Sequence, residues 1–136
     1  MFKALDVSTS GLVAQRQRMN TISGNIANVN TIVDSEGGAS PYQRRFVTFM
    51  AEKQGSKSDG GVGVQYRVEI DKDTKPRLVH QPGHPHANEN GYVAYPNINI
   101  VQEYVNAMEA NRAYEANVSA IEMTKEMTNL GLRILG

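Results

Sequence analysis

Cysteine is absent from this chain of 136 residues, and so is tryptophan. Without cysteine, the protein has no disulfide framework, no thiolate metal site and no cysteine nucleophile. Net charge is absent too, because 14 basic side chains balance 14 acidic ones. A neutral chain has no general electrostatic attraction to nucleic acid, and a net charge near zero favours association over repulsion. We therefore expect no nucleic-acid partner.

Long apolar segments are missing as well. No run of apolar residues approaches the roughly 20 that a helix needs to cross a bilayer. Residues 1–6 lack a charged start followed by an apolar stretch and a small-residue cleavage site, so they do not look like a cleaved signal peptide. These features predict a protein that stays in the cytoplasm or is exported by a route that leaves no cleaved signal.

The two ends of the chain carry helical patterns, whereas the middle carries strand and turn patterns. We expect an α+β fold in three parts: an N-terminal helix and turn over residues 1–31, a loop and small β-rich module over 32–97, and a C-terminal helix over 98–136. The two helices are expected to pair as an antiparallel-type coiled coil, because neither has a core of its own.

The N-terminal helix, expected over roughly residues 4–30, has an imperfect heptad seam. Its apolar residues recur at heptad spacing or at an offset of three, and they are Leu5, Leu12, Met19, Ile22, Ile26 and Val29. Ser8 and Gln15 interrupt this pattern. Gly11 and Gly24 each weaken an isolated helix by about 1 kcal/mol relative to alanine. We therefore expect this helix to depend on partners.

The C-terminal helix is expected over residues 100–135, capped by Asn99, and would be on the order of 50 Å long. It carries two apolar stripes. The first stripe contains Ala113, Ala116, Ala120, Met123, Met127, Leu130 and Ile134. The second stripe contains Tyr104, Ala107, Tyr114, Val118, Ile121, Leu132 and Leu135. Because the two together are wider than one partner helix can cover, we expect the N-terminal helix to cover one stripe and another partner to cover the other.

Strand patterns fill the middle of the chain. Residues 42–51 and 62–70 are rich in β-branched and aromatic residues and predict two strands, and residues 78–80 and 92–95 predict two shorter ones. Residues 55–63 are rich in glycine, serine and lysine, so a flexible connection is expected between the first two strands.

An asparagine-rich motif, Asn25-Ile26-Ala27-Asn28-Val29-Asn30-Thr31, follows the first helix. Asparagine side chains bond nearby backbone groups, so the residues alone predict a helix terminus. The motif also resembles the signature of the flagellar axial proteins, which are the rod, hook and hook-associated subunits of the bacterial flagellum. In that family an aromatic and a basic residue follow the threonine, and Pro41-Tyr42-Gln43-Arg44-Arg45 stands in that role here. The insertion at residues 32–40 is similar to a loop of the proximal rod subgroup.

The rest of the chain is similar to the same subgroup, in the same order. The matching segments are residues 60–64, 82–85, 90–93, 96–103, 105–108 and 111–117. The resemblance implies a rod subunit that leaves the cell through the flagellar type III export apparatus and assembles in the periplasm, with its terminal helices lining the export channel. The implied partners are further copies of the chain, other rod proteins, and rod-junction and inner-membrane ring components. No cofactor is implied.

The residues expected to carry self-assembly are two asparagines of the motif and the stripe positions of both helices. They are Leu5, Leu12, Met19, Ile22, Asn25, Ile26, Asn28, Tyr104, Ala113, Tyr114, Ala116, Asn117, Val118, Ala120, Ile121, Met123, Met127, Leu130 and Ile134. Burying a large aliphatic side chain contributes about 1.5–3 kcal/mol, which helps to offset the entropy lost when the helices become ordered. No catalytic arrangement stands out in the sequence, so we expect a structural protein and not an enzyme.

Other interpretations remain open at this stage. His80, His84 and His86 lie close together in one segment, and three imidazoles with an open fourth position could hold a catalytic zinc ion. Solvated loop histidines explain the same residues without a metal. A stand-alone coiled-coil adaptor would need sustained heptads, which Ser8 and Gln15 interrupt. A distal rod or hook subunit is a closer alternative, although such subunits are generally longer in the middle.

Overall fold

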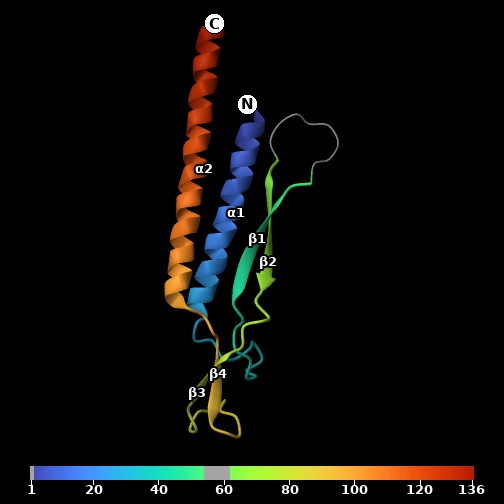
Figure 1. The fold of residues 1–136 in the computed structure, drawn as a ribbon, viewed down its shortest axis with the longest axis vertical. Helices are drawn as coiled ribbons and strands as arrows, with labels where there is room; N and C mark the ends of the chain where they lie inside the picture. Colours follow the sequence, from blue (N-terminus) through green and yellow to red (C-terminus); the bar gives the residue numbers. More distant parts are fainter. Residues whose placement is uncertain (1, 54–61) are drawn as a thin grey trace.

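The computed structural model describes residues 2–53 and 62–136. Along the chain, the elements are α1 (Phe2–Ala27), β1 (Arg45–Ala51), β2 (Val64–Ile70), β3 (Arg77–His80), β4 (Tyr92–Tyr95) and α2 (Ile100–Leu135). The two helices lie side by side and run in opposite directions (Figure 1). The expected α+β fold with paired terminal helices is therefore confirmed.

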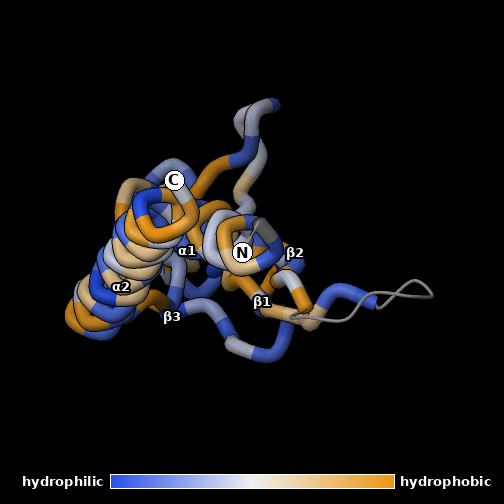
Figure 2. Tube along the Cα trace, turned by 90° about the horizontal axis from the view of Figure 1, so that it is seen from above, coloured by the Kyte–Doolittle hydropathy of each residue, from blue (hydrophilic) through white to orange (hydrophobic). Residues whose placement is uncertain are grey.

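Helix α1 is the middle one of three layers. Figure 2 shows it between α2 on one side and the β1–β2 hairpin on the other. Strands β1 and β2 pair antiparallel, with Arg45 opposite Ile70 at one end and Ala51 opposite Val64 at the other. The hydroxyl of Ser10 on α1 accepts a hydrogen bond from the Val64 N–H at 2.9 Å. This bond ties the start of β2 to the helix.

The strands expected between the two helices form the small β-rich part of the fold. They form two separate two-stranded sheets, β1–β2 and β3–β4. The β1–β2 hairpin lies along α1, whereas β3–β4 lies beyond the end of the helix pair (Figure 1). The two short strands expected at residues 78–80 and 92–95 are confirmed as β3 and β4. Most of the flexible connection expected at residues 55–63 falls outside the described residues.

Strand β2 begins at Val64 and not at Val62, and two further boundaries that differ from expectation lie in the segment between α1 and β1. The first helix ends at Ala27 and not near residue 30, because residues 28–30 form a turn. Strand β1 begins at Arg45 and not at Tyr42. The N–H of Tyr42 donates instead to the carbonyl oxygen of Thr31 at 2.9 Å, so this part of the chain pairs with the preceding loop.

Helix α2 is one uninterrupted helix of 36 residues. Asn99 is its N-cap, and the asparagine Oδ1 accepts the N–H of Gln102 at 3.2 Å, as the sequence predicts. At the other end, the N–H of Gly136 donates to the carbonyl oxygen of Leu132 at 2.9 Å. In the part of the chain that the structure describes, neither α2 nor α1 is apolar enough over its length to span a membrane.

Three contacts set how the two helices lie against each other, and we call this line of contacts the helix seam. They join Gly11 to Asn117, Arg18 to Glu109, and Asn25 to Glu103. At the first contact the helices approach closely. A Cβ atom placed on Gly11 would lie only 3.0 Å from side-chain atoms of Asn117. The seam is antiparallel, since residue numbers rise along one helix as they fall along the other.

The seam leaves the end of α2 uncovered. With Gly11 level with Asn117, the start of α1 at Phe2, nine residues earlier (11 − 2), is level with Glu126, nine residues later (117 + 9). Residues 127–135 of α2, which we call the overhang, therefore extend past α1 by about 13 Å at the usual helical rise. Figure 1 shows this extension at the C-terminal end of α2.

The single chain encloses few apolar side chains. Among the described residues, the buried hydrophobic ones are Ala14, Ile22, Val93 and Ala110, and the buried polar or charged ones are Thr21, Asn25 and Glu103. Two of the four hydrophobic residues are alanines, so little apolar area stabilises the fold. Polar contacts must therefore carry much of its specificity.

The close approach at Gly11 predicts that bulk there separates the helices. Replacing Gly11 with leucine should lower the free energy of unfolding by about 1–3 kcal/mol, because overpacking at this contact outweighs the gain in helix propensity. Chemical denaturation followed by circular dichroism measures the change. The matched control is Gly131→Leu, since a Cβ atom at Gly131 meets nothing within 4 Å. Equal stability of the two variants would contradict the close approach.

Candidate assembly interface

A buried cluster of polar groups joins α1, α2 and the start of β1. At its centre is the side chain of Asn25, which is 0% exposed. Its Nδ2 donates to the carbonyl oxygen of Arg45 at 2.7 Å and to Oε2 of Glu103 at 3.3 Å. Its Oδ1 accepts the N–H of Arg45 at 2.9 Å and the hydroxyl of Tyr42 at 3.2 Å. Both donors and both acceptor positions of the amide are thus used. We call Asn25, Tyr42, Arg44, Arg45 and Glu103 the polar cluster.

Glu103 brings α2 into this cluster. It lies in the first turn of the helix, and its side chain is 1% exposed. Nε of Arg44 donates to Oε1 of the carboxylate at 2.5 Å, while Asn25 bonds the other carboxylate oxygen. Removing one partner of a buried ion pair typically costs about 3–5 kcal/mol, because the other charge is left without compensation. Glu103 therefore anchors the start of α2 to the segment that precedes β1.

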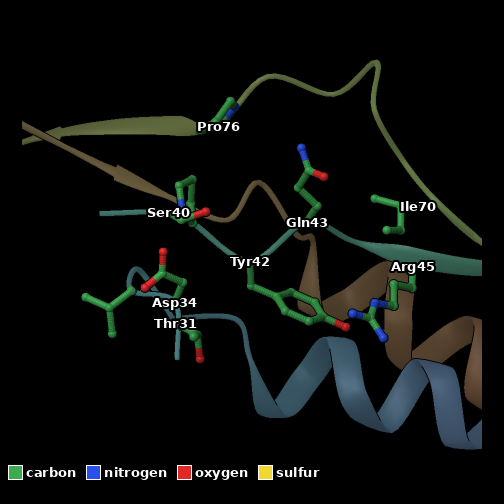
Figure 3. Close-up of a pocket in the computed structure, with 10 residues that line it drawn as sticks. Thr31, Asp34, Ser40, Tyr42, Gln43, Arg45, Ile70 and Pro76 are labelled. Atoms are coloured by element: carbon green, nitrogen blue, oxygen red, sulfur yellow. The ribbon is translucent and has the colours of Figure 1, made fainter. Parts of the chain in front are cut away.

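Tyr42 closes the cluster on its outer side. Partial burial raises the pKa of its phenol above the ordinary value of 10.0, although the positive charge of Arg45 acts in the opposite direction. The Arg45 guanidinium carbon lies 5.8 Å from the centre of the Tyr42 ring. Figure 3 shows the two side chains next to each other above α1. Because the phenol donates to Asn25, the neutral form is the one that the cluster uses.

An open cleft of about 550 Å³ lies beside the cluster (Figure 3). Its lining includes Tyr42, Arg45 and one carboxylate, Asp34. Oδ1 of Asp34 accepts the N–H groups of Glu36 at 3.0 Å and of Gly38 at 2.7 Å. The carboxylate therefore holds its own turn together. The lining supplies neither a paired carboxylate nor a nucleophile with a neighbouring base.

The histidine segment does not assemble a metal site. The ring of His80 packs edge-on against Tyr92, with centroids 4.9 Å apart. Nδ1 of His84 accepts the backbone N–H of His86 at 3.1 Å, which makes this nitrogen part of a local turn. Across the ranges 2–53 and 62–136, no group of three or more histidine, cysteine or acidic residues is placed to hold a metal ion. The zinc interpretation therefore has no ligand set in this structure.

The two asparagines that the sequence singles out in the motif have different positions. Asn25 is the centre of the polar cluster, whereas Asn28 ends the helix. Nδ2 of Asn28 donates to the carbonyl oxygen of Gly24 at 2.8 Å, and its Oδ1 accepts the hydroxyl of Thr31 at 3.1 Å. The side chain of Asn28 thus adds a second hydrogen bond to the Gly24 carbonyl oxygen, which also accepts the backbone N–H of Asn28 at 3.1 Å.

Most of the other expected assembly residues of α1 lie beside the helix seam and not on it. Ile22 is buried. The heptad positions Leu5, Leu12, Met19 and Ile26 are half-buried within the single chain. The seam itself runs through residues with smaller or polar side chains, such as Gly11 and Arg18.

On α2 the expected residues separate into two groups. Half-buried positions lie at or near the seam, and they are Ala113, Tyr114, Asn117, Val118, Ala120 and Ile121. Exposed positions lie away from it or on the overhang, and they are Tyr104, Ala116, Met123, Met127, Leu130 and Ile134. Helix α1 thus covers the middle of the second stripe, while most of the first stripe faces outward.

Sequence reasoning missed Glu103, Arg44 and Arg45 as a unit. A glutamate in the first turn of a helix is ordinarily a solvated partner of the helix dipole, so its position gave no sign of burial. The available signal was the line of small residues that shares its face: Ala107 and Ala110 follow Glu103 at spacings of four and three. Such a line indicates the face that another helix approaches.

Models of known protein families match the two ends of the chain that form the seam. The model described as "Flagella basal body rod protein" matches residues 5–32, and "Flagellar basal body rod FlgEFG protein C-terminal" matches residues 89–134. The paired terminal helices and these two matches define the class of protein, which is the flagellar basal-body rod proteins.

Comparison with individual relatives identifies the family within this class. The chain is 38% identical to "Flagellar basal-body rod protein FlgC" of Borreliella burgdorferi, with 99% of this chain and 97% of the relative covered. It is 41% identical to FlgC of Aquifex aeolicus, with 93% and 91% covered, and 35% identical to FlgC of Salmonella typhimurium, with 93% and 92% covered. The chain belongs to the FlgC family of flagellar basal-body rod proteins. The resemblance to axial proteins expected from the asparagine motif is therefore confirmed.

The hydrogen bonds of the polar cluster predict that replacing Asn25 strongly lowers the stability of the fold. Replacing Asn25 with alanine should lower the free energy of unfolding by about 2–3 kcal/mol, since it removes the partner of Oε2 of Glu103 and of the Arg45 backbone groups. Urea denaturation of the purified protein measures the change. The control is Asn30→Ala, an exposed asparagine of the same motif, which should stay within about 0.5 kcal/mol of the parent. A similar small effect at both positions would refute the role of the cluster.

The raised pKa of Tyr42 predicts a dependence on alkaline pH. Because the folded state holds the phenol proton more tightly than the unfolded state, this contribution to stability is present below pH 10.0 and is lost as pH rises through the folded pKa. Tyr42→Phe should lower stability by about 0.5–1.5 kcal/mol at pH 7 and should reduce the loss above pH 10. Denaturation curves from pH 7 to about 11 measure both effects. The exposed Tyr66→Phe serves as the control, and identical alkaline slopes in parent and Tyr42→Phe would contradict the assignment.

Proposed function

We propose that the chain is a structural subunit of the flagellar rod that polymerises through α1 and α2 into the hollow shaft around the export channel. Family membership supports the rod, and the described surface supports the mode of assembly. In this proposal the subunit passes torque through many parallel non-covalent contacts, and it catalyses no reaction. It leaves the cell through the flagellar type III export apparatus and is assembled in the periplasm.

The observation that carries the proposal is the outward-facing apolar surface of α2. Met123, Met127 and Leu130 are 57%, 63% and 57% exposed, and Ile134 is 84% exposed. These residues recur at spacings of four, three and four, so they form one continuous strip along the helix. Large contiguous apolar patches on a soluble chain mark sites of protein–protein contact.

Burial of the exposed strip favours a native state in which neighbouring subunits share an interface. Each large aliphatic side chain that moves from water into an interface contributes about 1.5–3 kcal/mol before ordering costs. Covering Met123, Met127, Leu130 and Ile134 would therefore stabilise a complex with a neighbour. If the contact pairs unlike surfaces of successive subunits and does not close into a ring, repetition of this contact builds a helical filament.

The proposal divides the chain by role. Residues 1–31 and 98–136 form the inner helical layer, and residues 32–97 form the outer part with the two small sheets. Half-buried positions such as Leu12, Met19 and Val118 complete the pairing within a subunit and contact neighbours at its edges. The proposed partners are further copies of the chain, other rod proteins, components of the rod junction and the inner-membrane ring, and, during export, the export apparatus.

A single charge on the strip tests the proposal. Leu130→Lys should abolish or strongly reduce swimming of cells that depend on this chain, because the lysine would have to be buried in the assembled rod. The matched control is Asn129→Lys, which adds the same charge to an exposed position on another face of the overhang. Both purified variants should unfold at the parent's temperature, since both positions are exposed. Normal swimming and intact rods with Leu130→Lys would overturn the proposal.

A further inference from the structure

We propose that the Asn25–Glu103 hydrogen bond selects the register of the two helices and thereby sets the length of the overhang. The bond lies at the far end of the seam from the overhang, where Nδ2 of Asn25 meets the buried carboxylate at 3.3 Å. The pairing of the helices is a property of the single chain. Only its consequence for assembly rests on the rod function proposed above.

The rest of the seam distinguishes poorly between registers. Of the buried apolar residues that the structure describes on the two helices, Ala14 and Ala110 are alanines, which fit against many neighbours, and Ile22 is the one larger side chain. The Arg18–Glu109 ion pair is partly solvated, with 26% and 61% of the two side chains exposed, so it contributes little. At the third contact, a slip of one heptad would place Thr124 opposite Gly11 in place of Asn117 (117 + 7), so a small polar side chain would again face the glycine.

A slip of one heptad removes the hydrogen-bond partner that α2 supplies to Asn25. Moving α2 by seven residues toward the sheet end places Ala110 opposite Asn25 in the position of Glu103 (103 + 7). The asparagine would then lose one of its four hydrogen bonds, and Glu103, displaced by about 10 Å, would lose both Asn25 and Arg44 as partners. A buried polar residue that is satisfied in only one alignment is a known way of fixing the register of paired helices.

The same slip changes what the chain can present to a neighbour. Seven residues correspond to about 10 Å along a helix, so the overhang of about 13 Å would nearly disappear. Met127 and Leu130 would then lie level with the first turns of α1 and not beyond them. In the native register these residues project past the subunit, where a neighbouring subunit can reach them from several sides.

Cross-linking of introduced cysteines tests the register directly, because the parent chain has no cysteine. One double variant carries Arg18→Cys with Glu109→Cys and reports the native register, in which these side chains touch at 3.2 Å. The other double variant carries Arg18→Cys with the exposed Ala116→Cys and reports a slip of one heptad (109 + 7). A bis-maleimide whose reach is shorter than two helical turns, about 11 Å, separates the two, and only cross-links within the monomer are scored.

The test compares Glu103 with alanine and with glutamine at that position. In the parent background, the native pair should cross-link at least about tenfold faster than the slipped pair, since a hydrogen bond to a charged group changes an equilibrium by roughly this factor or more. Glu103→Ala should raise the slipped product to within a few-fold of the native one while the helix content by circular dichroism is retained. Glu103→Gln, which can still bond Asn25, should restore the native preference.

Two outcomes would overturn the inference. If Glu103→Ala still cross-links only in the native register, other contacts fix the alignment. If Glu103→Ala loses its helix content, the residue is needed for folding and does not choose between registers. Swimming assays separate this inference from the proposed function: a variant with a confirmed slip that swims normally would leave the register assignment standing and would refute the assembly role of the overhang.

Discussion

The hydrogen bond between Asn25 and Glu103 connects the two ends of the sequence, and the rest of the arrangement depends on it. Through Asn25 the bond extends to the backbone of Arg45, and through Glu103 it extends to the guanidinium of Arg44. One buried cluster thus holds α1, α2 and the first strand in place. This matters because the described part of the chain has only four buried apolar residues, and two of them are alanines. Packing alone would leave the helices free to slide.

Helical and strand periodicities were sufficient to predict the architecture. The long proline-free pattern of residues 100–135 and its Asn99 cap gave α2 its bounds, because a cap and a continuous pattern are local signals. The separation of the strands into two sheets could not be predicted, since pairing between strands depends on contacts that the sequence pattern does not specify. The start of β1 at Arg45 could not be predicted for the same reason, because Tyr42 pairs with a loop residue.

The candidate interface was predictable where it is apolar and not where it is polar. Met127, Leu130 and Ile134 carry a hydrophobic stripe that any helical projection reveals, and they are exposed as an interface to a neighbour requires. Asn25 was identified through its motif, but its partners were not, because residues 25, 45 and 103 come together only in the folded chain. A buried glutamate is also an exception to the usual exposure of that residue type. In the proposed assembly, the polar cluster aligns one subunit and the apolar strip is left for the next.

Native-state hydrogen exchange of the isolated chain tests the central claim most directly. The amide of Arg45 donates to the buried Oδ1 of Asn25, so its exchange reports the opening of the polar cluster. We expect this amide to exchange as slowly as the most protected amides of α1, whereas amides of the overhang at residues 127–135 should exchange quickly. An Arg45 amide that exchanges as fast as those of the overhang would contradict it, because the cluster would then not hold the three elements together.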